Sequence, residues 1–380
     1  MKPLLPAVSA VVSTTVSVVA FASSLFFSGN AAAAPLPTPP TEAEKEHWKE
    51  HGRTLPTAEL LQPTLDAALP AFEAKRGREL AGRFKGASSD VLVGLAQGWI
   101  AAFQKYYPNV ALEVPPPYAG SLGAIELIKG DLDFVMVSRE LKPSDIADFR
   151  KKFGYAPWSV AIAGGTWRHF GFLDAVVFMV HRDNPLSSLS FAQLDALLST
   201  TRHRGGAAIR TWGQLGLTGE WADQPINLWA IKPWNGFEEF VRQRVLSVGD
   251  ARGEWREDPN MHLVPTVFPV SPNVAQDRYA LGYAGLAYVG PGVKLLALAE
   301  KSGGPAVAPG YEEVARADYP LSRVCYLNLN KKPGAPLNPA LEEFARFILS
   351  REGQQVVLDR KIFLPLRAAQ AAASRAFVAK

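Results

Sequence analysis

The sequence has very little cysteine and no cluster of charges of one sign. Cys325 is its one cysteine in 380 residues, which excludes an intramolecular disulfide framework and a zinc site built on several thiolates. The 40 basic and 36 acidic side chains leave a net charge of +4, and basic residues nowhere form a run of four. Nucleic acids and anionic membrane surfaces are bound by clustered cations, so we expect neither as a partner.

Nucleotide-binding motifs and long apolar runs are also scarce. The sequence contains neither GxGxxG nor GxxxxGK[ST], so the common nucleotide-binding enzymes find no support. After residue 34 there is no stretch of 18 apolar residues of the kind that spans a membrane. The proportions of 48% hydrophobic and 20% charged residues are typical of a globular protein, and the length suits two ordinary domains.

The first 34 residues have the features of a signal peptide. Lys2 gives a basic start, residues 11–27 are apolar, and Ala31 to Ala34 offer the small side chains that a signal peptidase accepts. The alternative is a membrane-anchoring helix, but the apolar core is barely long enough to span and four prolines follow within residues 35–40. We therefore expect an exported protein with a signal peptide at 1–34 and an N-terminal extension at 35–81.

From Phe84 onward, strand-like and helix-like segments alternate, which predicts an α/β protein with mainly parallel sheets. The clearest helix covers residues 92–106, where apolar residues recur every three or four positions until Pro108. A shorter helix is expected in the leader around 42–51. Further strands are expected at 110–114, 134–137, 175–180, 226–231, 283–289 and 324–329, and further helices at 121–130, 191–198, 236–245 and 339–349.

Three of these helices begin at short polar loops. They follow Ser88-Ser89-Asp90, Gly120-Ser121 and Asn235-Gly236. The start of a helix exposes unpaired backbone N–H groups and the positive end of the helix dipole, which attract anions. The alternative is that each polar residue caps its own helix. The loops form one site only if the fold brings them to one cleft, and the periodicity does not decide this.

Two further segments carry cations beside such loops. Ser138-Arg139 follows the strand expected at 134–137, so the guanidinium emerges at a carboxyl end, where its planar fork suits an oxyanion. The alternative is a salt bridge with Glu140 or another nearby acid. Lys232-Pro233-Trp234-Asn235-Gly236 combines a cation, an aromatic face and a helix start, which suits an anion or a planar ligand. Trp229 and Trp234 are equally compatible with core positions.

Two patterns typical of enzymes receive less support. His47-Trp48-Lys49-Glu50-His51 matches the zinc pattern HxxEH, but it lies in a charged segment without a third ligand, so a solvated helix face is the better interpretation. Ala119-Gly120-Ser121-Leu122-Gly123 departs at Ala119 from the nucleophile pattern GxSxG. A serine hydrolase using Ser121 would also need a histidine, and the contexts of His169, His181, His203 and His262 single none out. We expect no catalytic activity, metal or cofactor.

Several motifs follow one another in a specific order and spacing between about residues 82 and 366. They are Ser88-Ser89-Asp90, 99–103, 107–110, Gly120-Ser121, 130–134 and 138–141, continued by 280–285, 319–323, 330–334 and 350–354. This order and spacing resemble a known family, the Pst-type periplasmic phosphate-binding proteins, which are the substrate-binding components of ABC importers.

This resemblance implies the fold of a type II periplasmic binding protein, with two α/β lobes joined by crossover strands and a ligand cleft between them. By the same resemblance, lobe I consists of residues 82–180 plus 319–380 and lobe II of residues 181–318. It implies a monomer that binds phosphate or a related oxyanion and presents it to an inner-membrane ABC permease.

The resemblance also implies site residues. Ser88, Ser89 and Asp90 fall on the first loop of the family's site, Ser121 on the second, and Ser138 and Arg139 on the third. A carboxylate such as Asp90 can accept a hydrogen bond from a protonated oxyanion.

The second lobe departs from the family pattern, which has an arginine followed by a Ser-Gly-Thr loop. Here Lys232, Trp234, Asn235 and Gly236 occupy that stretch, and both hydroxyls are missing. Each lost charge-assisted hydrogen bond weakens anion binding by about 1.5–3 kcal/mol. This leaves open a bulkier or less charged organic ligand, with Trp234 as a platform.

Overall fold

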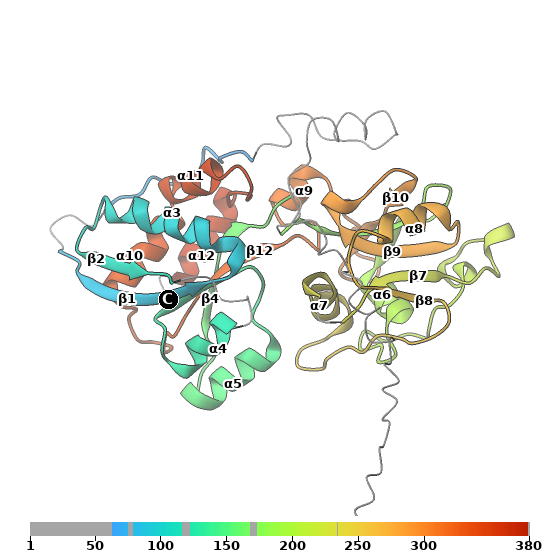
Figure 1. Ribbon diagram of the computed structural model, residues 1–380, viewed down its shortest axis with the longest axis horizontal. Helices are drawn as coiled ribbons and strands as arrows, with labels where there is room; N and C mark the ends of the chain where they lie inside the picture. The colour runs from blue at the N-terminus through green and yellow to red at the C-terminus, as the bar shows by residue number, and fades with distance from the viewer. Residues whose placement is uncertain (1–62, 75–78, 116–121, 168–172, 234, 379–380) are drawn as a thin grey trace, which may run out of the picture. The chain divides into compact units, whose positions relative to one another are not determined.

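The computed structural model describes residues 63–74, 79–115, 122–167, 173–233 and 235–378 (Figure 1). The signal peptide expected at 1–34, the leader helix with its HxxEH pattern, Ser121 and Trp234 lie outside these residues.

Two five-stranded sheets organise the described chain, each in its own lobe. The strands of the first sheet are, in spatial order, β2 (Val110–Glu113), β1 (Gly82–Ser88), β3 (Phe134–Val137), β12 (Val324–Leu329) and β4 (Trp158–Gly164). Those of the second are β10 (Val293–Leu295), β5 (Val176–His181), β9 (Ala280–Gly285), β7 (Asn227–Ile231) and β8 (Met261–Val264). A separate two-stranded sheet consists of β6 (Ser188–Ser190) and β11 (Ala297–Ala299), which follow β5 and β10 in the chain.

The sheets are mixed, so the expectation of mainly parallel sheets is wrong. Strand β1 runs parallel to β2 and β3, and β7 runs parallel to β8 and β9. Strand β12 is antiparallel to β3 and β4, and β5 is antiparallel to β9 and β10. The reason is the connection between the lobes: the chain leaves the first sheet at the end of β4, enters the second as β5, and later re-enters the first as β12 from the opposite direction.

Strand β5 also corrects one expected boundary. It pairs with β9 and β10, so residues 176–180 belong to the second sheet although the sequence analysis assigned them to lobe I. The chain therefore crosses between Gly164 and Val176.

Helices cover the sheets (Figure 1). The expected helix at 92–106 is α3 (Val93–Gln104), preceded by the 3-10 turn η2 (Asp90–Leu92). The strand expected at 283–289 is shorter than predicted, because β9 ends at Gly285 and a 3-10 turn, η6 (Leu286–Tyr288), follows. The other helices of the first lobe are α4 (Leu122–Lys129), α5 (Pro143–Phe153), α10 (Pro339–Ile348), α11 (Arg351–Asp359) and α12 (Ala368–Val378). The second lobe has α6 (Phe191–Leu198), η3 (Trp212–Leu215), η4 (Gly219–Trp221), α7 (Gly236–Val241), the π-helical turn η5 (Arg242–Leu246), α8 (Val270–Gln276) and α9 (Tyr311–Ala315).

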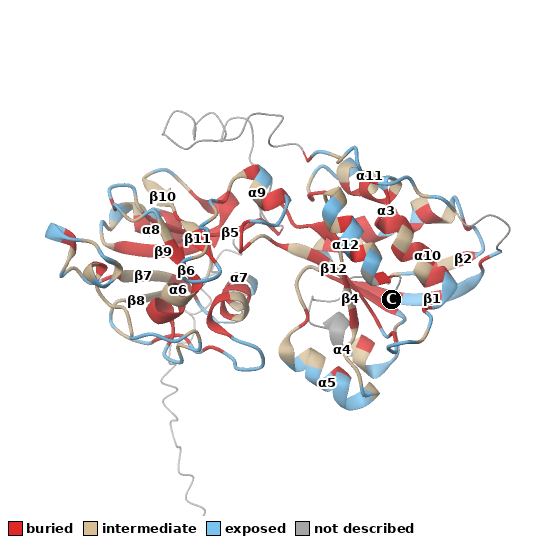
Figure 2. Ribbon diagram, turned by 180° about the vertical axis from the view of Figure 1, so that it is seen from behind, coloured by how far each residue is buried: buried red, intermediate tan, exposed pale blue. Residues whose placement is uncertain are grey.

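The first sheet is buried on both faces, as its strand sequences predict. Phe134 and Met136 of β3 belong to one apolar cluster with α3, α10, α11 and α12, while Val135 and Val137 belong to another with α4 and α5. This alternation is the two-residue period of a strand, and a run that is apolar at every position is typical of a strand covered on both faces. Figure 2 shows β5 and β9 of the second sheet and β4 and β12 of the first largely in the buried colour, whereas β8 is intermediate throughout.

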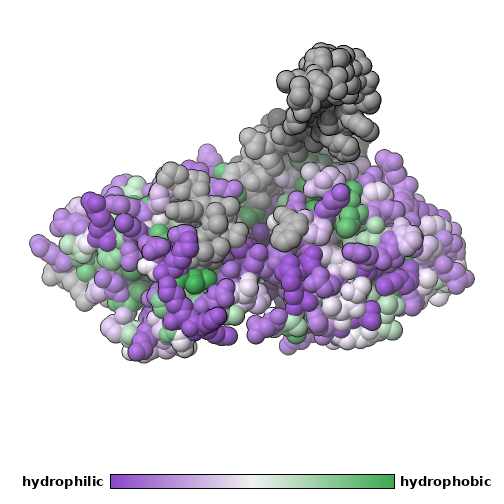
Figure 3. All heavy atoms as spheres, turned by 60° about the horizontal axis from the view of Figure 1, so that its bottom comes forward, coloured by the Kyte–Doolittle hydropathy of each residue, from purple (hydrophilic) through white to green (hydrophobic). Residues whose placement is uncertain are grey.

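The face of the molecule in Figure 3 shows little contiguous apolar area among the described residues. On the face shown in Figure 3, hydrophobic residues form small separate groups among hydrophilic ones. Large hydrophobic side chains that are exposed within the described ranges are Tyr106, Val248 and Phe268. Of the helices in those ranges, none combines the length and hydropathy needed to cross a membrane.

Candidate functional site

The carboxyl ends of β1 and β3 lie side by side and bring two of the predicted loops together. Ser88 is the register partner of Met136, and the Ser89 backbone N–H donates to the Met136 carbonyl at 3.0 Å. Ser138 is two residues beyond Met136 on the neighbouring strand. The structure therefore places Ser88, Ser89 and Ser138 at one edge of the first sheet, where ligands of open α/β sheets gather.

Strand β12 brings a cation to the same edge that the sequence analysis did not select. Because β12 runs antiparallel to β3, its start lies beside the end of β3, with Tyr326 opposite Val137. Arg323 directly precedes β12, and its carbonyl accepts a hydrogen bond from the Gly165 N–H at 2.8 Å, just beyond the end of β4. The start of β12 and the ends of β1, β3 and β4 thus meet at one place, which we call the crossover edge.

Buried polar atoms at the crossover edge lack hydrogen-bond partners within the described chain. Ser88 and Ser89 are 1% and 2% exposed, and the Ser89 side chain does not cap the helix that follows it. Nearly all buried polar groups in folded proteins are hydrogen-bonded, so several unpartnered ones together indicate a place for a polar ligand or water. The five atoms are Ser88 Oγ, Ser89 Oγ, Thr166 Oγ1, Ser322 Oγ and Arg323 Nε.

Arg323 is the buried positive charge of this edge. Burial lowers the pKa of the Arg323 guanidinium, whereas the carboxylates of Asp174 and Glu140 act in the opposite direction. An arginine side chain stays protonated in proteins, so the charge remains and needs compensation. The carboxylate of Asp174, which is fully buried in the segment between β4 and β5, compensates part of this charge. Its Oδ2 also accepts a hydrogen bond from the Ala287 N–H at 2.8 Å.

The second lobe reaches the crossover edge through α7. The Arg323 guanidinium lies 4.2 Å from the centroid of the Phe240 ring. Asn235 caps α7, since its Oδ1 accepts a hydrogen bond from the Phe237 N–H at 2.9 Å. Of the two roles that the sequence left open for this loop, Asn235 has the role of a helix cap. Gly236 is exposed, and a side chain there would meet nothing within 4 Å.

Arg139 forms a salt bridge, which the sequence left open as the alternative to contact with an oxyanion. Its Nη1 donates to the Glu140 carbonyl at 2.9 Å and lies 4.0 Å from Asp145 Oδ2. Burial lowers the pKa of Arg139, and the charges of Asp145, Glu239 and Glu140 oppose this shift. Glu239 lies on α7, so Arg139 also interacts electrostatically with the second lobe.

The remaining predicted residues are less enclosed. Asp90 is exposed, and its Oδ1 accepts from the neighbouring Val91 N–H at 2.9 Å. Lys232 is also exposed, and its backbone N–H donates to the Val264 carbonyl at 2.8 Å beside the β7–β8 ladder. Trp229 stacks on His262 of β8, with ring centroids 4.5 Å apart. A ligand-binding role for any predicted site residue stays a prediction, including Ser121 and Trp234 outside the described residues.

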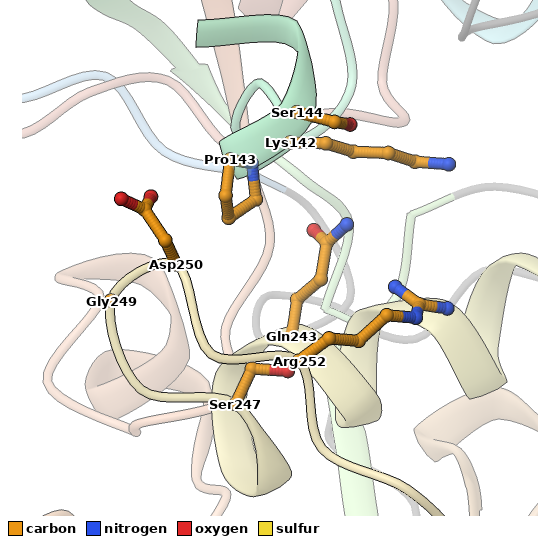
Figure 4. Close-up of a pocket in the computed structure, with 8 residues that line it drawn as sticks. All are labelled: Lys142, Pro143, Ser144, Gln243, Ser247, Gly249, Asp250 and Arg252. Carbon is orange, nitrogen blue, oxygen red and sulfur yellow. The ribbon is translucent and has the colours of Figure 1, made fainter. Parts of the chain in front are cut away.

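A pocket of about 190 Å³ lies where α5 of the first lobe meets η5 of the second (Figure 4). Arg252 donates to both carboxylate oxygens of Glu239, at 2.9 and 2.7 Å. Burial alone raises the pKa of Glu239, but Arg252, Gln243 and Lys142 together hold it below its ordinary value. Arg252 therefore stabilises the ionised Glu239 by direct hydrogen bonds, and Lys142 of the other lobe adds to this through its charge. The pocket is lined by Lys142, Pro143, Ser144, Gln243, Ser247, Gly249, Asp250 and Arg252.

Sequence reasoning missed Arg323 and Phe240, although Arg323 carried a signal. It stands next to the buried strand expected at 324–329, as Arg139 stands next to the strand at 134–137. Because β12 runs antiparallel to β3, the residue that precedes β12 lies at the same edge of the sheet as the residues that follow β3. Phe240 carried no comparable signal, because apolar helix positions are normally core positions.

Comparisons with known proteins agree with this architecture. The family described as "PBP superfamily domain" matches residues 74–352. The phosphate-binding protein PstS of Pseudomonas aeruginosa is 34% identical over 311 residues, which cover 81% of this chain and 90% of that protein.

Solved structures support the fold alone. PstS from Borrelia burgdorferi superposes with a TM-score of 0.52 at 17% identity, covering 75% of this chain and 98% of that one. An ABC-type phosphate transport receptor from Vibrio cholerae gives 0.50 at 17% identity, with 75% and 100% covered. The predicted class, two α/β lobes in the manner of a type II periplasmic binding protein, is confirmed. The chain therefore belongs to the PBP superfamily and, within it, to the family of PstS-type phosphate-binding proteins that its motifs resemble.

Proposed function

We propose that this protein captures phosphate or a related oxyanion in the periplasm and delivers it to the permease of an ABC importer. The observation that carries the proposal is the crossover edge, where Ser88, Ser89 and the buried Arg323 offer unpartnered donors. Family membership supports the same ligand class. The function requires no chemical step, only closure of two lobes stabilised by the ligand.

The crossover edge has the donor set that an oxyanion needs. Hydroxyls of Ser88 and Ser89 can each donate one hydrogen bond, and the guanidinium supplies charge with a planar array of N–H groups. Phe240 covers that guanidinium from the second lobe at 4.2 Å, so a ligand on Arg323 lies next to both lobes. Binding and closure are coupled for this reason.

We also propose the organisation of the whole chain. Residues 1–34 act as a signal peptide and 35–81 as an N-terminal extension. The first lobe holds the sheet of β1 to β4 together with residues 319–380, and the second runs from Val176 to residue 318, supported by the pairing of β5 with β9. The mature protein works as a monomer without a cofactor or nucleic acid.

Isothermal titration of the mature protein with phosphate at low salt tests the function. We expect saturable binding at one site per chain and a rise in melting temperature. Arg323→Ala and Ser89→Ala should weaken binding, because each removes a donor at the crossover edge. Arg278→Ala is the matched control, since that guanidinium pairs with Glu220 on the surface of the second lobe, with oxygens at 3.0 and 2.7 Å. If millimolar phosphate gives neither heat nor a thermal shift, the proposal fails.

A second candidate is an organic ligand that carries an anionic group, and an aromatic group beside α7 favours it. Phe237 in the first turn of α7 contacts Tyr288 with ring centroids 5.9 Å apart, and Tyr288 contacts the exposed Phe268 at 5.1 Å. Such rings suit an apolar substituent. Mass spectrometry of small molecules that co-purify with the protein separates this candidate from phosphate.

We propose that the protein is not an enzyme. The PstS relative from Pseudomonas aeruginosa is named for phosphate binding, and the similar receptor from Vibrio cholerae is named for phosphate transport. A serine hydrolase that uses Ser121 predicts covalent labelling by a fluorophosphonate probe, lost in Ser121→Ala. Detection of such labelling would contradict the proposal.

A further inference from the structure

Residues 63–74 of the N-terminal extension pack along the first lobe, and we call this segment the strap. Leu69 is 1% exposed and belongs to the apolar cluster of the first lobe. The Phe72 ring makes edge contacts with Tyr106 and Phe347, with centroids 5.1 and 5.2 Å apart. A segment with such contacts is part of the folded lobe rather than a loose leader.

The strap is hydrogen-bonded to the start of α11 and to the start of α12. The Arg351 N–H donates to the Pro70 carbonyl at 2.8 Å, and its guanidinium donates to the carbonyls of Leu69 and Ala67 at 3.2 and 2.8 Å. Asp66 Oδ2 accepts from the Ala368 N–H at 2.8 Å. All of these partners belong to the first lobe, so they fix the strap to that lobe.

Arg367 links the strap to the second lobe. Its Nη1, just before α12, donates to the Thr64 carbonyl at 3.2 Å and to Thr64 Oγ1 at 3.0 Å. Its Nη2 reaches Glu312 Oε2 of α9 in the second lobe, 3.3 Å away. Burial raises the pKa of Tyr311, the first residue of α9, and Thr64 opposes this shift. Arg367 therefore connects the strap with α9.

We propose that the strap clamps α9 to α12 and limits the movement of the two lobes relative to each other. A movement that separates these helices has to break the contact of Arg367 with Glu312, and Thr64 supports this contact by accepting two hydrogen bonds from Arg367. Those contacts exist in the arrangement in which Lys142 and Gln243 line one pocket. The strap therefore favours this arrangement of the lobes over more open ones.

Pulsed electron paramagnetic resonance of the mature protein without ligand tests the clamp. Cys325 is fully buried and burial raises the pKa of its thiol to about 12, so spin labels attach selectively to cysteines introduced at exposed positions. Asp131→Cys in the first lobe and Glu257→Cys in the second provide the pair.

Arg367→Ala is the sharpest test variant, because it removes the bridge between Thr64 of the strap and Glu312 of α9. Thr64→Val keeps the shape of the side chain and removes the Oγ1 that accepts from Arg367 Nη1 at 3.0 Å. Arg278→Ala is the control, because that guanidinium pairs with Glu220 on the surface of the second lobe.

We expect Arg367→Ala and, to a smaller extent, Thr64→Val to broaden the interlobe distance distribution while Arg278→Ala matches the parent. Identical distributions in the parent and Arg367→Ala would overturn the clamp, provided that melting temperatures show both to be folded. A second readout rests on the proposed function: phosphate affinity should fall about three- to tenfold in Arg367→Ala, the weight of a lost hydrogen bond. If the parent itself binds no phosphate, the proposed function fails, and the distance measurement still decides the clamp.

Discussion

The guanidinium of Arg323 lies 4.2 Å from the centre of the Phe240 ring, so an aromatic side chain of the second lobe covers a buried cation at the edge of the first. A cation over a ring that is shielded from water is attracted by about 2 kcal/mol. The contact joins the two lobes at the place where unpartnered hydroxyls gather, which connects lobe closure with the electrostatics of the crossover edge.

This contact gives the first prediction. Phe240→Leu keeps an apolar side chain and loses the ring quadrupole, so phosphate affinity should fall about three- to thirtyfold, equivalent to about 0.5–2 kcal/mol. Phe240→Tyr keeps the ring and should bind nearly as tightly as the parent. Isothermal titration measures both variants. The role assigned to Phe240 is wrong if the leucine variant binds like the parent while Arg323→Ala does not bind.

A second prediction concerns the buried ion pair between Glu238 of α7 and Arg242 of η5. Glu238 is 0% exposed and accepts from Arg242 Nε at 2.6 Å and from Trp255 Nε1 at 2.5 Å. Glu238→Gln removes the buried charge that compensates the Arg242 guanidinium and leaves it only the exposed Glu254, 3.0 Å from its Nη1, so the free energy of unfolding should fall by about 3 kcal/mol. Urea titration gives the value.

The exposed pair of Arg278 and Glu220 is the control for this measurement. Its side chains are 43% and 57% exposed. Glu220→Gln should cost less than about 1 kcal/mol, because exposed ion pairs are weak. Equal losses in the two glutamine variants would show that the burial of Glu238 is unimportant.

A third prediction follows from the lone thiol. Burial raises the pKa of Cys325 to about 12, and the nearby Arg323 opposes the shift only in part. At pH 8 about one thiol in ten thousand is then ionised, so the folded protein should not react with a disulfide reagent on the scale of minutes. In guanidinium chloride the reaction should be complete. Rapid labelling of the folded protein, read from absorbance, would refute the buried position.

A fourth prediction concerns the acid stability of the strap. Hydrogen bonds from the backbone N–H groups of Ala368 and Ala68 lower the pKa of Asp66, and Arg367 adds to the effect. A carboxylate with a lowered pKa stabilises the fold above its unfolded pKa of about 3.9, and this contribution is lost as the pH falls through the folded value. The parent should therefore lose more stability than Asp66→Asn between about pH 6 and pH 3. Parallel losses in urea titrations at the two pH values would contradict this.

The apolar pattern was sufficient to locate many of the elements. The strands predicted at 134–137 and 324–329 coincide with β3 and β12, because a short run that is apolar at every position fits a strand covered on both faces. Ser88 and Ser89 are site candidates in the sequence because they open the helix expected at 92–106 and fall on the first loop of the family pattern. The same local information did not give the direction of β12, and for this reason Arg323 was missed.

Local sequence also left open what each polar group does. Arg139 was predicted either to meet an oxyanion or to pair with an acid, and its 4.0 Å approach to Asp145 depends on how α5 packs after β3. The extension at 35–81 gave no sign that Thr64 meets Arg367, because the two residues are 303 positions apart in the chain.

By itself, the sequence determined the α/β class, the family and most of the secondary structure, since these follow from periodicity and motif order along the chain. Only the tertiary structure decided that the start of β12 shares an edge with the ends of β1 and β3, that Phe240 covers Arg323, and that Arg367 meets both the strap and α9. The physical reason is that strand direction and contacts between distant residues arise from packing the whole chain, whereas an apolar period reports only which face of one element is buried.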